Sequence, residues 1–344
     1  MTQAPLKTHR FGLVLAPGFS HLGLAMVIEP LFIANWITQR KLFSWQLLSS
    51  DGLAVAASNG MRTAVDLPLS STDYFDTILV LASFDARQAA TDDRLLKWLR
   101  WAERAGSEIG AIETGSEILA AAGMLKNCII PVHWYNIEGM RERYPQLDVA
   151  NILYNLTGPH PVSAGASATL DMMIALINRI AGQELAQDIA HHLLLQNRQS
   201  NTRQMPPESQ NQELTNQDPV ARARRIMAAT IEEPKSCLQI AKLVGLSERH
   251  LQRLFQQHVG MGMAQIYHML RMERAHQLVQ LTDLTITQIA IACGFSSLEL
   301  FSRTYRKNFN VSPSRDRRQS IEASVFRQSD WRRPGAKPAV KKSH

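Results

Sequence analysis

An internal repeat constrains the last third of the chain more than any other sequence feature. Residues 239–262, QIAKLVGLSERHLQRLFQQHVGMG, are similar to residues 288–312, QIAIACGFSSLELFSRTYRKNFNVS. The copies match at an offset of 49 positions and, after one inserted residue, of 50. In each copy a short helical pattern is followed by a glycine, Gly245 or Gly294, which suits a turn that needs a positive φ. The repeat therefore predicts an all-helical region built from two helix-turn-helix units.

The second helix of each unit is predicted to have an apolar back and a polar front. Ser247 and Ser296 are suitable N-cap residues for these helices. The predicted apolar stripes are Leu251, Leu254, Phe255 and Val259 in the first helix, and Phe301, Tyr305 and Phe309 in the second. The polar fronts are Arg249, Gln252, Arg253 and Gln256, and Ser302, Arg303 and Arg306. Arginine can bind guanine edges and glutamine adenine edges, so these fronts fit a major groove of DNA.

The charge distribution points to the same region. Residues 1–205 hold 16 Lys and Arg against 18 Asp and Glu, whereas residues 206–344 hold 21 against 12. The excess of positive charge lies entirely in the second segment, which favours a polyanion as its partner.

A polar segment at 198–218, RQSNTRQMPPESQNQELTNQD, contains only Met205 and Leu214 as large apolar residues. Such a composition cannot bury a core and is typical of a linker. We therefore predict a first domain at 8–197, a linker at 198–218, a second domain at 219–320 and a basic disordered tail at 326–344.

The first domain alternates short apolar runs with longer helical patterns. Strands are expected at 11–16, 44–50, 77–82 and 108–112, and helices at 22–37, 92–106, 166–182 and 184–197. This alternation predicts an α/β fold with a mostly parallel sheet covered on both faces.

The rest of the composition restricts location and chemistry. The three cysteines, Cys128, Cys237 and Cys293, have no metal-ligand or disulfide spacing. The N-terminus has no hydrophobic signal core, and no apolar run is expected to approach the ~18 residues that a membrane span needs. We expect a cytoplasmic protein with no membrane contact, no metal and no cofactor.

The segment from about 220 to 318 resembles the DNA-binding domain of AraC-type regulators. The resemblance covers both helix-turn-helix units, the joining segment with RMERA at 271–275, and the stretches ACGFSS and VSPSRDR at 292–297 and 311–317. It implies base-facing positions at Arg249, Gln252 and Arg253 in the first unit and at Glu299, Ser302 and Arg303 in the second. The chain departs from the family pattern at Asn310, where glycine is usual, and at Asp316, where an aromatic residue is usual.

The first domain resembles the class I glutamine-amidotransferase-like fold of PfpI type, which is flavodoxin-like. Joined to the second domain, it is similar to the GlxA-type branch of AraC regulators. The residues that carry the resemblance are APGFS at 16–20, EPLFIANW at 29–36, ETGSEILAAAGML at 113–125, VHW at 132–134 and SAGASATLDMMIALI at 163–177.

Catalytic members of the wider fold carry a cysteine at a sharp turn between a strand and a helix, and a nearby acid supports its thiolate. Here that turn carries Glu113, and no cysteine lies between residues 1 and 127. Two interpretations stay open: Glu113 caps the following helix, or it belongs to a ligand pocket. The pocket would also contain Glu29, His133 and Trp134. The last two are equally compatible with structural roles.

Carboxylates beside an aromatic face suit a cation, and donors at the start of the helix after Glu113 could hold a ligand carboxylate. Regulators of the resembled subgroup respond to arginine or to quaternary amines such as betaine and carnitine. The resemblance thus implies a cationic or zwitterionic effector.

We therefore expect a cytoplasmic transcription regulator, an activator rather than a repressor, that binds double-stranded DNA, responds to a small amine-bearing metabolite, forms a homodimer and contacts RNA polymerase. We expect it not to be an enzyme. Two alternatives stay open: an amidotransferase-like hydrolase with an appended DNA-binding module, and an architectural DNA-binding protein without a ligand.

Overall fold

The computed structural model describes residues 7–69, 73–84, 86–195 and 218–319. The chain divides into two compact units, with the main boundary between Gln204 and Met205. The predicted linker, apart from Asp218, and the predicted tail lie outside the described residues.

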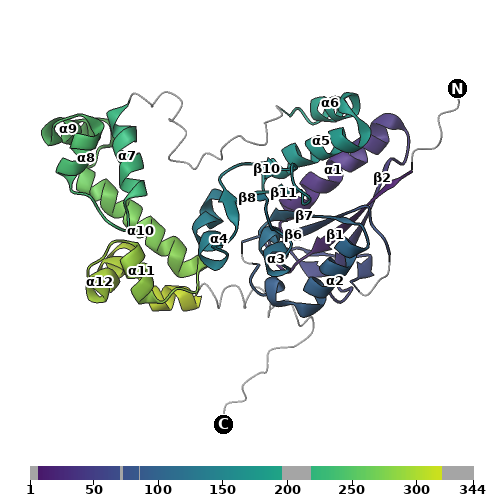
Figure 1. Cartoon of the computed structure of the whole chain (residues 1–344), viewed down its shortest axis with the longest axis horizontal. Helices are drawn as coiled ribbons and strands as arrows, with labels where there is room; N and C mark the ends of the chain where they lie inside the picture. The colour runs from purple at the N-terminus through teal and green to yellow at the C-terminus, as the bar shows by residue number, and fades with distance from the viewer. Residues whose placement is uncertain (1–6, 70–72, 85, 196–217, 320–344) are drawn as a thin grey trace, which may run out of the picture. The chain divides into compact units, whose positions relative to one another are not determined.

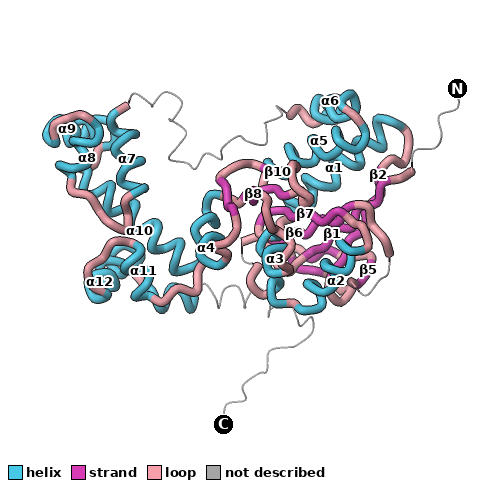
Figure 2. Tube along the Cα trace, viewed as in Figure 1, coloured by secondary structure: helices cyan, strands magenta, loops and turns pink. Residues whose placement is uncertain are grey.

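The first unit is built on a seven-stranded sheet in the order β10-β11-β7-β6-β1-β2-β5 (Figures 1 and 2). All neighbouring strands in it are parallel except β10 and β11. Two small sheets, β3-β4 and β8-β9, accompany it. The strands are β1 (His9–Leu15), β2 (Phe43–Ser49), β3 (Val55–Ala56), β4 (Arg62–Thr63), β5 (Leu67–Pro68), β6 (Thr77–Ala82), β7 (Glu108–Glu113), β8 (Ile129–Pro131), β9 (Asp148–Ala150), β10 (Tyr154–Asn155) and β11 (Val162–Ser163).

Helices cover both faces of this sheet, as the alternation of the sequence predicted (Figure 1). One face packs against α1 (His21–Thr38) and α5 (Ser167–Ala181), and α6 (Gln183–His192) packs on these two helices. The other face packs against α2 (Asp93–Arg104) and α3 (Gly115–Ala121), whereas α4 (Ile137–Arg143) packs against β9 of the small β8-β9 sheet and joins the same hydrophobic cluster. Two short 3-10 helices, η1 (Ala89–Thr91) and η2 (Trp134–Asn136), complete the unit.

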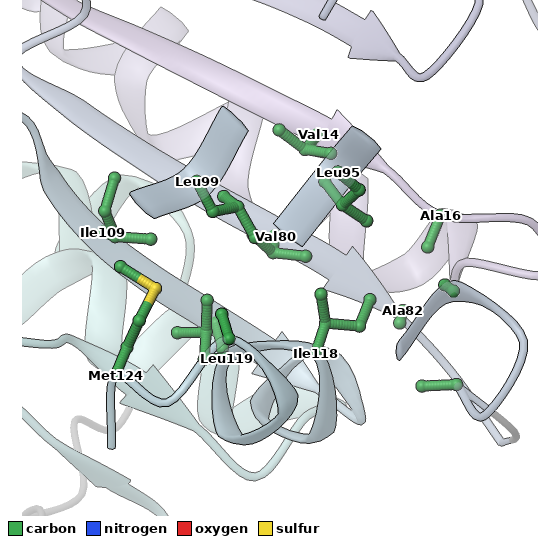
Figure 3. Packing of buried hydrophobic residues seen from close by; sticks show 14 of the residues in the cluster. Val14, Ala16, Val80, Ala82, Leu95, Leu99, Ile109, Ile118, Leu119 and Met124 are labelled. Atoms are coloured by element: carbon green, nitrogen blue, oxygen red, sulfur yellow. The ribbon is translucent and has the colours of Figure 1, made fainter. Parts of the chain in front are cut away.

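The central strands are mostly apolar, because β6 is buried along its whole length and β1 is buried from Phe11 on. Along β1, Leu13 and Leu15 belong to the cluster under α1, whereas Val14 belongs to the opposite cluster, as expected for side chains that alternate across a sheet. Figure 3 shows this second cluster, in which Leu95 and Leu99 of α2 and residues of α3 face the strands. The expected strands and helices are confirmed, with shifts of a few residues at their ends.

Helix α1 corrects one expectation. It has 18 residues with a mean hydropathy of 1.3, so it is the one described helix that is long and apolar enough to cross a membrane. Its buried side, which includes Val27 and Leu31, packs in the cluster shared with α5. Core helices of soluble proteins share this length and composition, so α1 is weak evidence for a membrane.

The described part of the second unit is helical: α7 (Pro219–Ala229), α8 (Cys237–Val244), α9 (Glu248–Val259), α10 (Met263–Leu281), α11 (Ile286–Ala292) and α12 (Leu298–Phe309). Residues 313–319 are also helical. The turn glycines Gly245 and Gly294 have φ values of 83° and 71°, as predicted.

The predicted helix caps are half confirmed. Ser247 caps α9 by accepting a hydrogen bond from His250 N at 3.3 Å. The prediction for Ser296 was wrong by one position, since Ser297 caps α12 and accepts from Leu300 N at 3.2 Å. The inserted residue precedes the cap, so the offset of 50 already applies there.

Each helix-turn-helix unit has its own core, and α10 contributes to both. Figure 1 shows α10 running from the group of α7, α8 and α9 to the group of α11 and α12. Met263, Ile266 and Tyr267 from its first half pack with α7, α8 and α9. Met272, Ala275, Leu278 and Val279 from its second half pack with α11 and α12. The long helix therefore joins two separately packed reading units.

Both departures from the family pattern have a local explanation. Asn310 ends α12 with a left-handed φ of 57°, a conformation that asparagine tolerates better than most residues other than glycine. Asp316 is buried and accepts a hydrogen bond from the hydroxyl of Tyr305 at 2.6 Å. His276 Nδ1 lies 3.1 Å from the same carboxylate. A polar cluster thus takes the place of an aromatic contact.

Candidate functional site

The outer sides of α9 and α12 form the candidate DNA-reading surface. Their inner sides are fixed by buried aromatic residues at equivalent positions, Phe255 in α9 and Tyr305 in α12, each with no exposed area. This packing leaves Arg249 and Arg253 exposed on α9, and Glu299, Arg303 and Arg306 exposed on α12.

Of the other two predicted base-facing residues, Gln252 is exposed but has a partner within the domain. Gln252 Oε1 accepts a hydrogen bond from Met263 N at 3.2 Å, so its side chain holds the start of α10. Ser302, its counterpart 50 positions later, is only partly exposed. The structure therefore gives Gln252 a contact within the domain that its sequence position did not indicate.

The sequence reasoning missed four exposed residues on the reading sides. His250 and Gln257 in α9 and Leu300 and Lys307 in α12 are all exposed. Each lies three residues before or four after the reading-side arginine of its helix, so 3.6 residues per turn places it on the same side. That spacing could have revealed them.

Glu113 occupies the strained turn at the end of β7. Its φ is 59°, which is uncommon for a residue other than glycine. Ser83 Oγ donates a hydrogen bond to Glu113 Oε1 at 2.8 Å, and the backbone N–H of Phe84 donates to the same carboxylate. Gly165 packs against the side chain so closely that a Cβ there would lie 2.8 Å from Glu113 Cγ. Loops after β6 and β11, the two neighbours of β7, therefore enclose this carboxylate.

Backbone strain is concentrated around this side chain. Phe84 and Ala166 also have positive φ values, of 55° and 47°. Strained conformations of this kind persist where the surroundings hold them, and they cluster at ligand and active sites. The three strained residues lie at the carboxyl ends of adjacent parallel strands, where ligands of open α/β sheets bind.

Burial raises the pKa of Glu113 to about 7, and this effect outweighs the hydrogen bonds from Ser83 and Phe84, which lower it. The carboxylate is therefore only partly ionised at neutral pH when no cation faces it. A cation placed beside it would favour the ionised form.

The helix-capping interpretation of Glu113 does not match these contacts. The N-cap residue of α3 is Thr114, and the acidic residue in the first turn is Glu117. The carboxylate of Glu113 is held by Ser83 and Phe84 instead.

The expected meeting of Glu29 and Glu113 is wrong. Glu29 is exposed, whereas Val27, Pro30 and Leu31 around it are buried. The helical period of α1 therefore turns Glu29 away from the sheet. Among the described residues the Glu29 carboxylate has no hydrogen bond or ion pair.

His133 and Trp134 have structural contacts on their own segment. His133 Nδ1 accepts a hydrogen bond from Tyr135 N at 3.3 Å, and burial lowers the pKa of this histidine. Its ring centroid lies 5.3 Å from that of Trp134. Trp134 packs against the cluster that contains Ile118 and Leu119 of α3. The residues that hold the Glu113 carboxylate, by contrast, come from the loops after β6 and β11.

The described residues contain no group of three or more His, Cys, Asp or Glu side chains that could hold a metal ion. All three cysteines are free. Burial raises the pKa of the Cys293 thiol to about 12, and this residue packs in the core of the second helix-turn-helix unit.

An α/β domain joined to a pair of helix-turn-helix units defines a class, the two-domain transcription regulators that bind DNA. A family model described as a helix-turn-helix domain matches residues 240–319. The HTH-type transcriptional regulator CdhR of Pseudomonas aeruginosa is 36% identical over 314 residues, which is 89% of this chain and 91% of that protein. GlxA of Rhizobium meliloti is 31% identical over 314 residues, 91% of this chain and 97% of that protein. The chain belongs to this GlxA-type family of AraC transcription regulators.

The solved structures support the fold of the first unit. A putative transcriptional regulator from Vibrio parahaemolyticus aligns with a TM-score of 0.50 and 20% identity, over 54% of this chain and all of that structure. At this identity the likeness concerns the fold alone.

Proposed function

We propose that the chain is a transcription regulator whose DNA binding responds to a small amine-bearing metabolite bound at Glu113. The observation that carries the proposal is the strained, enclosed carboxylate at the turn after β7, in a chain that also has paired DNA-reading helices. Holding three residues at positive φ costs of order 1–3 kcal/mol each. A site with that cost is better explained by ligand binding than by packing.

A cationic group fits the chemistry of this turn. The raised pKa of Glu113 reflects burial without a neighbouring positive charge. An ammonium or guanidinium group would supply that charge and form a charge-assisted contact. Phe84 follows Ser83, the residue whose hydroxyl donates to the carboxylate, and its ring is exposed. The face of an aromatic ring attracts ammonium and guanidinium groups. Compounds of arginine, betaine or carnitine type combine this cation with a carboxylate.

The remaining features of the proposal extend what the sequence resemblance implies. We take the protein to be a cytoplasmic activator that contacts RNA polymerase and forms a homodimer. We take the first unit to be non-catalytic, because the turn carries a carboxylate instead of the thiol on which the catalytic members of the fold depend.

The decisive experiment is calorimetric titration of the full chain with arginine, betaine and carnitine. We expect one of these to bind wild type, and Glu113→Gln to lose at least tenfold in affinity because an uncharged amide lacks the charge-assisted contact. Binding to wild type should strengthen about tenfold per pH unit as the pH rises toward 7, since the carboxylate ionises over that range.

The matched control is Glu29→Gln, which removes an exposed carboxylate from the same unit. It should bind like wild type, and both variants should keep wild-type DNA affinity in the absence of ligand. Equal affinities of wild type and Glu113→Gln for the ligand would remove Glu113 from the site.

A further inference from the structure

The second reading helix carries an apolar side chain where its counterpart carries a polar one. Leu300 in α12 is 38% exposed and is absent from the cluster of buried residues that packs this helix. Its equivalent in α9, 50 positions earlier, is His250. The core of the second unit is formed by Phe301 and Tyr305, which have no exposed area. Leu300 is therefore not part of this core, and more than a third of its side chain is exposed.

Its position lies on the reading side of α12. Leu300 precedes Arg303 by three residues and Lys307 by seven, so the three side chains follow one another along one side of the helix. Arg303 and Lys307 are exposed. Leu298, which is 44% exposed, precedes the buried Phe301 and Tyr305 by the same two spacings. It therefore lies on the inner side, at the end of the helix.

The major groove of DNA offers one apolar feature to such a side chain, the C5-methyl group of thymine. Leucine can neither donate nor accept a hydrogen bond, so against any other base edge it would remove water without replacing its hydrogen bonds. We infer that Leu300 contacts a thymine methyl group, and that the second reading unit prefers thymine at one fixed position of its half-site. This inference rests on the DNA-binding function and is independent of the proposed effector.

The experiment begins with selection of binding sites for the full chain from a random library of duplex DNA. Each thymine in the part of the site protected by the second unit is then replaced, one at a time, by deoxyuridine, which lacks only the methyl group. At one position this replacement should weaken wild-type binding by about fourfold, which corresponds to about 0.8 kcal/mol for one buried methyl group. Leu300→Ala should bind thymine and deoxyuridine at that position equally well.

Leu298→Ala is the matched control, since it removes an exposed leucine from the same turn of α12. It should discriminate thymine from deoxyuridine as wild type does. Both variants should keep their fold, which thermal unfolding checks, because the core of this unit is formed by Phe301 and Tyr305. Three results would overturn the inference: a selected half-site without thymine, equal wild-type affinity for both bases at every position, or discrimination that persists in Leu300→Ala. Discrimination that persists in Leu300→Ala would mean that another residue contacts the methyl group, and that the exposed Leu300 side chain serves contact with a protein partner.

Discussion

At the scale of single residues, the candidate effector site depends on a glutamate held in an unfavourable backbone conformation and an unfavourable environment. Gly165 allows this arrangement, since any side chain there would collide with Glu113. Ser83 and Phe84 provide two donors, yet burial still raises the pKa of the carboxyl group to about 7. Such a residue is expected to lower the free energy of unfolding of the protein without ligand, and its presence is explained by effector binding.

This leads to a prediction about stability and pH. The unfolded chain releases the Glu113 proton near pH 4.5, whereas the folded protein keeps it up to about pH 7. The free energy of unfolding therefore falls as the pH rises through this window. Glu113→Gln removes the effect, so it should be more stable than wild type at pH 8, by at most about 3 kcal/mol, with little difference below pH 4.5.

Thermal unfolding followed by tryptophan fluorescence measures this in the first unit, because residues 219–319 contain no tryptophan. Glu29→Gln, at an exposed position of the same unit, serves as the control and should unfold like wild type. A difference between wild type and Glu113→Gln that is the same at pH 4 and pH 8 would contradict the raised pKa.

At the scale of elements, the two reading helices share one design but differ in chemistry. Both helices expose an arginine at the equivalent position, Arg253 in α9 and Arg303 in α12. In each helix the inner side is buried in the core of its own unit. The surrounding reading positions differ, with His250 and Gln257 in one and Leu300 and Lys307 in the other. The two halves of the operator are therefore expected to differ in sequence.

Arg253→Ala and Arg303→Ala should each weaken specific DNA binding by about 1–3 kcal/mol if each contacts a base. Fluorescence anisotropy with a selected site measures this, with Arg40→Ala as a control at an exposed arginine of the first unit. The two contacts should protect major-groove segments about one helical turn apart. Protection of a single segment would mean that only one unit reads DNA.

The polar cluster behind α12 gives a further prediction. Tyr305→Phe leaves the buried Asp316 carboxylate without its hydroxyl donor, which should destabilise the second helix-turn-helix unit by about 1–3 kcal/mol. Hydrogen exchange in α11 and α12 should accelerate accordingly. Tyr74→Phe removes an exposed hydroxyl whose hydrogen bond is 3.4 Å long, and it should change nothing. Unaltered exchange in Tyr305→Phe would show that His276 alone satisfies Asp316.

At the scale of the whole molecule, α1 leaves an apolar stripe uncovered. Leu22, Phe32 and Trp36 are each more than half exposed on one side of α1. The exposed Glu29 lies on the same side, seven residues after Leu22 and three before Phe32. Exposed apolar patches of this kind mark interaction sites. This stripe is the surface through which we expect the homodimer to form.

Phe32→Glu should therefore shift the protein from dimer to monomer in sedimentation velocity experiments, because it replaces an aromatic contact with a second carboxylate next to Glu29. The fold should survive, since Phe32 is exposed. Trp101→Glu changes an aromatic residue that is 40% exposed on α2, and it should leave the dimer intact. A wild-type protein that sediments as a monomer, or a Phe32→Glu variant that remains a dimer, would exclude this surface.

The sequence alone determined the class of fold and the presence of the reading helices. The long apolar strands, the amphipathic helices and the repeated glycine turns are local patterns whose period identifies each element. Short strands such as β10 and β11 were not predicted, because a stretch of two residues is too short to show an alternating pattern. Their pairing depends on which neighbouring strands the folded sheet places beside them.

Tertiary structure alone decided which residues meet. The sequence marked Glu113 as a candidate, but it placed Glu29 beside it, and only the packing of α1 shows that Glu29 is exposed. Ser83, Phe84 and Gly165 lie at least 29 positions from Glu113 and enclose it because parallel strands bring their carboxyl ends together. Gln252 likewise had the right residue type for reading adenine, yet its carbonyl oxygen binds the backbone of α10. A residue's type and spacing limit its chemistry, whereas the partner that uses this chemistry depends on contacts between distant segments.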